Sequence, residues 1–89
     1  MRLSKIKDLE KLNLAGCHLL TDEGIRNLPQ KLKAIDLSLC QKLTAAAILH
    51  LPPHLTKLNL SWFNQLSIRA IIESLPEDLE ELNLMCVIR

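Results

Sequence analysis

The sequence contains few aromatic residues, few glycines and no long apolar run. Among its 89 residues there are one Phe, one Trp and no Tyr, although 48% of the residues are hydrophobic. A core built from leucine with almost no aromatic residues suits a layered repeat better than a single compact globule. With only two glycines, the sequence also lacks a glycine-rich loop that could cradle a phosphate group.

Membrane and secretory segments are not expected. The longest apolar runs, Ala45–Leu49 and Leu84–Ile88, contain five residues each, whereas a membrane-spanning helix needs about 20. The first twelve residues include no continuous apolar stretch of the kind found in a signal peptide.

The charges are balanced and scattered. Eleven basic and ten acidic residues give a net charge of +1, and no basic cluster marks a nucleic-acid-binding face. His18, His50 and His54 share no metal-ligand spacing, and no Ser/His/Asp constellation is suggested. We therefore expect neither a metal nor a cofactor, and no enzyme activity.

One apolar pattern organises the chain. The segment from Leu32 to Cys40 reads L-x-x-I-x-L-x-x-C, and equivalent segments begin at Leu9, Leu55 and Leu79, at intervals of 23, 23 and 24 residues. A fixed period of this length indicates a solenoid. We predict one domain over residues 1–89, with repeats at about 9–31, 32–54 and 55–78 and a partial repeat at 79–89.

Each repeat is predicted to contain a strand followed by a short helix. The central I-x-L alternates as a half-buried strand does, and Thr21, Thr44 and Ser67 are suitable helix N-caps. Leu-Pro pairs then end the helices, which we place at Ala45–Leu51 and Ile68–Leu75 in the second and third repeats. The residues before Leu9 are predicted to form a partial helical turn. The fold class is therefore an α/β solenoid, a right-handed β/α superhelix with about four parallel strands on the concave side and three short helices on the convex side.

The pattern L-x-x-L-x-L-x-x-C-x-x-L-T, present from Leu9 to Thr21 and from Leu32 to Thr44, resembles the leucine-rich repeat family. Thr21–Ile25 looks like the T-D-x-G-L of its cysteine-containing subclass, which is found in F-box proteins that present substrates to ubiquitin ligases. Similar repeats occur in bacterial effectors delivered into host cells. That subclass usually has a longer repeat with a second cysteine after the helix, where this chain has Leu-Pro.

Two of the three cysteines occupy one repeat position. Cys17 and Cys40 are therefore expected in adjacent layers as small buried hydrophobic residues, and Phe63 and Val87 fill the same column. Packing explains these cysteines without disulfides, so a reducing cytoplasm is the simpler location. Cys86 lies one residue off this column and is expected to point outward.

Strand alternation places polar residues on the concave face. One column contains Asn13, Asp36, Asn59 and Asn83, and the next exposed column contains Ala15, Ser38, Ser61 and Met85. The polar column could serve partner binding, or it could serve solubility and side-chain ladders between strands.

Leu39 and Trp62 are expected to be exposed on neighbouring strands, touching at one rim of the concave face. Trp is enriched at interface hot spots, although both residues could instead pack against the turn of the next repeat. We predict a non-catalytic protein–protein interaction module that binds a protein partner through the concave face, with the site residues Trp62, Leu39, Asp36, Asn59, Asn13 and Asn83. The alternative is a truncated fragment of a larger repeat protein.

The last strand has no following repeat in this sequence. Its backbone N–H and C=O groups would be open along one side, and such an edge invites pairing with another chain. We predict self-association through Leu79–Ile88, most simply as a two-fold homodimer.

Overall fold

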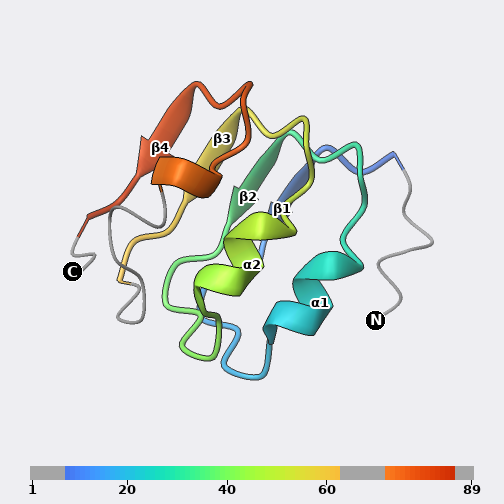
Figure 1. Ribbon diagram of the computed structural model, residues 1–89. Coiled ribbons are helices and arrows are strands. Elements are labelled where there is room, and N and C mark those ends of the chain that lie inside the picture. Colours follow the sequence, from blue (N-terminus) through green and yellow to red (C-terminus); the bar gives the residue numbers. More distant parts are fainter. Residues whose placement is uncertain (1–7, 63–71, 86–89) are drawn as a thin grey trace.

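The computed structural model describes residues 8–62 and 72–85, and within them the chain forms successive coils of strand, turn and helix (Figure 1). The elements follow in the order β1 (Lys11–Asn13), α1 (Asp22–Arg26), β2 (Ala34–Asp36), α2 (Ala45–Leu49), β3 (Lys57–Asn59) and β4 (Glu81–Asn83). Residues 72–74 add a helical turn between β3 and β4. This is the predicted α/β solenoid of four parallel strands and three short helices. The helical turn predicted before Leu9, the cap at Ser67 and the orientation of Cys86 lie outside the described residues.

The four strands form one parallel sheet in the order β1-β2-β3-β4. Leu12, Ile35, Leu58 and Leu82 lie side by side across it, so the register advances by 23, 23 and 24 residues. These steps equal the repeat intervals, because each repeat adds one strand and then returns through its turn and helix. The sequence pattern therefore predicted both strand order and register.

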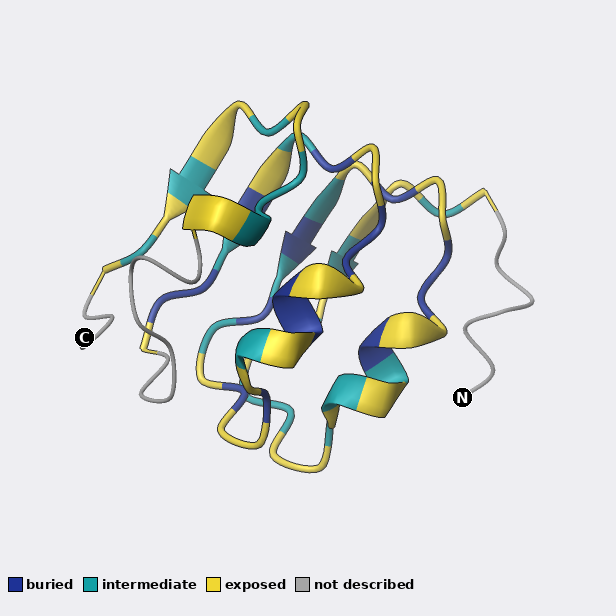
Figure 2. Ribbon diagram, in the orientation of Figure 1, coloured by how far each residue is buried: buried dark blue, intermediate teal, exposed yellow. Residues whose placement is uncertain are grey.

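The core lies between the sheet and the helices, as the buried segments in Figure 2 show. Its fully buried side chains come mainly from the apolar positions of the two central repeats: Leu32, Leu37, Leu43, Leu55 and Leu60. Ile35 and Leu58 are each 3% exposed, whereas their equivalents Leu12 and Leu82 in the outer repeats are only partly buried. A layer of a solenoid is covered by the layers on both sides, so burial falls where the described stack has a neighbour on one side only.

Helix α2 is shorter than predicted. Helix α2 ends at Leu49 rather than Leu51, and the backbone N–H of His50 and of Leu51 donate to carbonyls three residues earlier, at Ala47 and Ile48. Such i→i−3 bonds tighten and close the last turn. The predicted stop at Leu-Pro was therefore too late, because the helix has already closed before proline can interrupt it.

The predicted N-caps differ in how they bond. Thr44 accepts a hydrogen bond at its hydroxyl from the N–H of Ala46, as a cap should. Thr21 occupies the equivalent position before α1 without a side-chain cap bond, so the prediction for its hydroxyl was wrong. The carboxylate of Asp22 instead accepts both the N–H and the hydroxyl of Thr44, at 2.9 and 2.6 Å. This pair ties the starts of α1 and α2 together across the repeat boundary.

Candidate functional site

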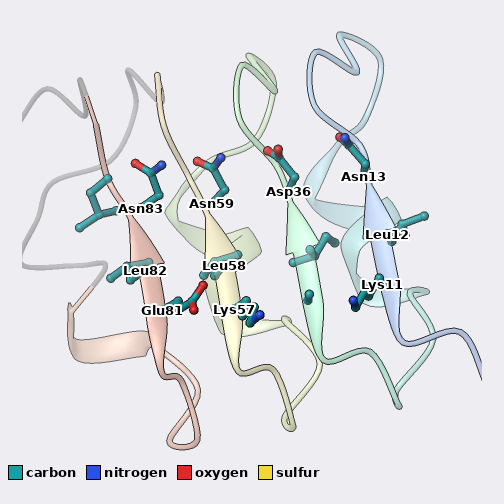
Figure 3. A pocket seen from close by; sticks show the side chains of 13 residues that line it. Lys11, Leu12, Asn13, Asp36, Lys57, Leu58, Asn59, Glu81, Leu82 and Asn83 are labelled. Carbon is teal, nitrogen blue, oxygen red and sulfur yellow. The ribbon is translucent and has the colours of Figure 1, made fainter.

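A groove runs across the strand face of the sheet, opposite the helices (Figure 3). It encloses about 750 Å³, and residues of all four strands contribute to its lining. The residues that line it are Lys11, Leu12, Asn13, Ala34, Ile35, Asp36, Lys57, Leu58, Asn59, Glu81, Leu82, Asn83 and Leu84. The concave face predicted from strand alternation is thus a continuous surface on which four repeats meet.

Two polar rows cross the groove, one at each end of the strands. Asn13, Asp36, Asn59 and Asn83 end the four strands and lie in register with one another. At the other end, the register aligns Lys11, Ala34, Lys57 and Glu81. We call the first set the Asx row and the second the charged row. Figure 3 shows the Asx row in the upper half of the sheet and the lysines and Glu81 in the lower half.

The side chains of the Asx row each close a turn at the end of their strand. The side-chain Oδ1 of each member accepts the backbone N–H of the residue two positions later, at 2.9, 2.9, 2.9 and 3.0 Å, and these donors are Ala15, Ser38, Ser61 and Met85. This is an Asx-turn, in which the side chain replaces a backbone acceptor and bends the chain out of the strand. The four predicted site residues of this row are therefore brought together, with one oxygen of each already engaged.

The column after the Asx row, which contains Ala15, Ser38, Ser61 and Met85, was predicted to be exposed throughout, but it is not. Ser61 is 5% exposed, and its hydroxyl donates to Oδ1 of Asn83 on the next strand at 2.7 Å. Ser38 instead donates to Asp36 of its own repeat, also at 2.7 Å. The prediction that Ser61 is exposed was therefore wrong, and its hydroxyl bonds across to the next strand, whereas that of Ser38 stays within its own repeat.

Leu39 and Trp62 lie in the turns that follow the Asx row, and they do not line the groove. Their side chains are 45% and 52% exposed, which confirms the prediction of exposure. The backbone N–H of Leu39 donates to the carbonyl of Ser61, and that of Trp62 donates to the carbonyl of Met85. The sheet's bonding thus continues past the strands and holds the two turns in neighbouring repeats at the rim of the groove. Direct contact between the two side chains stays a prediction.

The backbone at these turn positions is unusual. Leu39 has φ +60° and Trp62 has φ +69°, and the equivalent residue of the first repeat is Gly16, with φ +75°. Residues with a Cβ rarely adopt this left-handed conformation, which glycine adopts without strain. The large apolar side chains of Leu39 and Trp62 are therefore half-exposed at a position where the backbone favours glycine.

The charged row was missed by the sequence reasoning. Its members stand two residues before the Asx row, so the same strand alternation that places Asn13 on the concave face places Lys11 there too. The available signal was the pair Lys11 and Lys57 at one repeat position. Lys11 and Lys57 form no basic run along the chain, but a solenoid brings together residues that are whole periods apart.

Cys40 lies in the core as predicted, with 2% of its surface exposed. Cys17 is only partly buried against the same core. The thiol of Cys40 donates to the carbonyl oxygen of Leu14 in the preceding repeat at 3.1 Å. Burial away from water raises the pKa of the Cys40 thiol above its usual value. A neutral, hydrogen-bonded thiol of this kind packs between layers and is a poor nucleophile.

Comparison with known proteins agrees with this geometry. Residues 5–28 match the family model described as Leucine Rich repeat. The match covers the first repeat, and the parallel-stranded α/β solenoid described above has the architecture of leucine-rich repeats. Comparison with curated proteins gives no significant match, and comparison with solved structures gives none. Leucine-rich repeats are typical of protein-interaction modules, which bind through the extended concave surface that stacking creates.

In residues 8–62 and 72–85, no three His, Cys, Asp or Glu side chains gather as a set that could hold a metal ion. Among the helices in that part of the chain, none has the length and apolar character needed to cross a membrane.

Proposed function

We propose that this chain is a non-catalytic protein–protein interaction module that holds a protein partner against its concave face, with Trp62 as the main anchor and Leu39 beside it. The observation that carries the proposal is the conformation and exposure of these two residues. A left-handed backbone costs a residue with a Cβ about 1–2 kcal/mol. Gly16 occupies the same turn in the first repeat, so the turn accepts glycine. We therefore assign the half-exposed side chains of Trp62 and Leu39 to partner binding rather than to the turn.

The groove beside the anchor supplies the polar part of the proposed interface. In Asp36 and Asn59, Oδ1 accepts the backbone N–H that closes the turn. The other terminal atom, Oδ2 of Asp36 or Nδ2 of Asn59, is the group assigned to the partner, with Asn13 and Asn83 extending the row to both sides. Because the turn bond fixes each side chain, little rotamer entropy is lost when a partner binds. An aromatic anchor flanked by fixed polar groups is the usual composition of an interface centre.

Substitution of Trp62 tests the proposal. Trp62→Ala is expected to weaken partner binding by at least about 2 kcal/mol, the hot-spot threshold. Leu49→Ala is the matched control, since Leu49 is a large apolar residue, 67% exposed, at the end of α2 on the helical side. Binding measured by calorimetry should fall for Trp62→Ala alone. Equal binding by both variants would contradict the proposal. Blue-shifted emission of the single Trp in the free protein, resistant to acrylamide, would also contradict it, because the side chain would then be packed inside.

A second candidate is that this array belongs to a larger repeat assembly. Leu82 on β4 and Leu84 just after it are only partly buried, whereas their equivalents Leu58 and Leu60 are 3% and 0% exposed. We propose that β4 pairs along its outer edge, either with a further repeat of a longer protein or with β4 of a second copy in a two-fold dimer. The longer protein would be the substrate-recognition array of a ubiquitin-ligase adaptor or a bacterial effector.

The packing of Cys40 as a free thiol suits a reducing compartment, and we propose the cytoplasm.

A further inference from the structure

The charged row of the groove carries two lysines on alternate strands with a small residue between them. Lys11 on β1 pairs in register with Ala34 on β2, which pairs in turn with Lys57 on β3. All three line the groove, and both lysines are exposed. Parallel strands lie about 4.8 Å apart, so the two lysine backbones stand about 9.6 Å apart across the groove. The methyl group of Ala34 leaves the space between the two ammonium groups open.

In the described residues, neither lysine forms an ion pair with an acidic group. The ion pairs of that part of the protein join Arg26 to Glu23, Lys31 to Asp8 and His54 to Asp78, all away from the groove. Asp36 faces the groove from the same strand as Ala34, but its Oδ1 accepts the N–H and hydroxyl of Ser38 in the turn beyond the strand. Glu81 faces Lys57 from β4 on the side away from Ala34. Lys11 and Lys57 therefore make the space above Ala34 the positive part of the groove.

We infer that the groove recognises a protein partner through an exposed Asp or Glu carboxylate, which lies above Ala34 and is held by Lys11 and Lys57 together. This inference rests on the proposed function and adds the chemistry of the partner. A carboxylate has two oxygens, each able to accept from an ammonium group, and the two lysines approach it from opposite sides. The Asx row and the Trp62 rim lie at the other end of the strands, so the partner's acidic residue and its apolar residue occupy opposite edges of one interface.

The probe is a library of random twelve-residue peptides displayed on phage and selected against the full chain. The expected result is enrichment of Asp or Glu in the selected peptides. A synthetic copy of one such peptide should bind Lys11→Glu and Lys57→Glu about tenfold more weakly at low salt, because attraction becomes repulsion. Lys11→Gln should bind the peptide about fivefold more weakly at most, which is the upper end for the loss of one exposed ion pair. Lys33→Glu is the matched control, since Lys33 is exposed beside Ala34 but does not line the groove, and should bind normally.

Two further readouts depend on charge alone. Glu81→Gln removes a negative group beside Lys57 and should tighten binding of the acidic peptide about twofold. Binding should also weaken between about 0.01 M and 1 M salt, as the Debye length falls from about 30 Å to 3 Å. Circular dichroism confirms the fold of each variant.

The outcomes separate this inference from the proposed function. Peptides that lose affinity on Trp62→Ala but carry no acidic residue, or are insensitive to reversal of both lysines, would overturn the carboxylate site and leave the interaction module standing. Peptides insensitive to Trp62→Ala and to both lysine reversals would overturn both. A library that yields no binder to the full chain would also count against both.

Discussion

Leu39 offers a direct test of the strained turn. Its φ of +60° is favourable for glycine and unfavourable for alanine. Leu39→Ala and Leu39→Gly both remove the packing of the side chain, so that loss cancels when the two variants are compared. The left-handed conformation costs alanine about 1–2 kcal/mol, and the greater freedom of glycine in the unfolded chain costs about 0.5–1 kcal/mol. Leu39→Gly should therefore be more stable than Leu39→Ala by about 0.5–1 kcal/mol.

Ala34 is the matched control for this comparison, because it lies in β2, where the backbone is extended. Ala34→Gly should lose about 0.5–1 kcal/mol relative to the natural chain, the ordinary preference for alanine over glycine. Urea unfolding followed by circular dichroism measures both differences. A change of 1 kcal/mol shifts the melting temperature by about 4–8 °C in a domain of this size, which is readily resolved. If Leu39→Ala proves as stable as Leu39→Gly, the turn is not strained and the main support for an anchor at this rim is lost.

The remaining predictions concern the core and the sheet edge. Cys40→Asp should be severely destabilising because it buries a charge without a partner. Cys40→Ala should cost only about 1–2 kcal/mol for the lost sulfur and its hydrogen bond to the Leu14 carbonyl. Equal, negligible effects in thermal melts would show that residue 40 is not between layers. The raised pKa of the Cys40 thiol means that the folded state holds this proton more tightly than the unfolded state, so stability should fall as pH rises above 9.0, the ordinary value, and this loss should be absent in Cys40→Ala. If β4 pairs with a second copy, sedimentation should show association that increases with concentration, and a monomer at high concentration would contradict the dimer.

Much of the candidate site was accessible from the sequence, because repetition converts spacing along the chain into proximity in space. The interval from Asn13 to Asp36 equals the interval from Leu12 to Ile35, so residues that share a repeat position lie side by side in the sheet. The same logic correctly gave the exposure of Leu39 and Trp62 and the burial of Cys40. It failed at Ser61 and Thr21, where the choice of hydrogen-bond partner, and not the apolar pattern, decides the outcome.

The apolar period by itself determined the fold class, the strand order and the register, since a shift of one residue would turn each strand's leucines away from the core. It could not determine what the polar atoms do. The tertiary structure decided three features. Each Asx side chain closes its own turn, and Asp22 bonds Thr44 of the next repeat. Leu39 and Trp62 take a left-handed backbone. The physical reason is that burial depends on a side chain's apolar area, which a sequence states directly. Hydrogen bonds and backbone angles depend instead on which donors and acceptors the neighbouring repeat brings within about 3 Å.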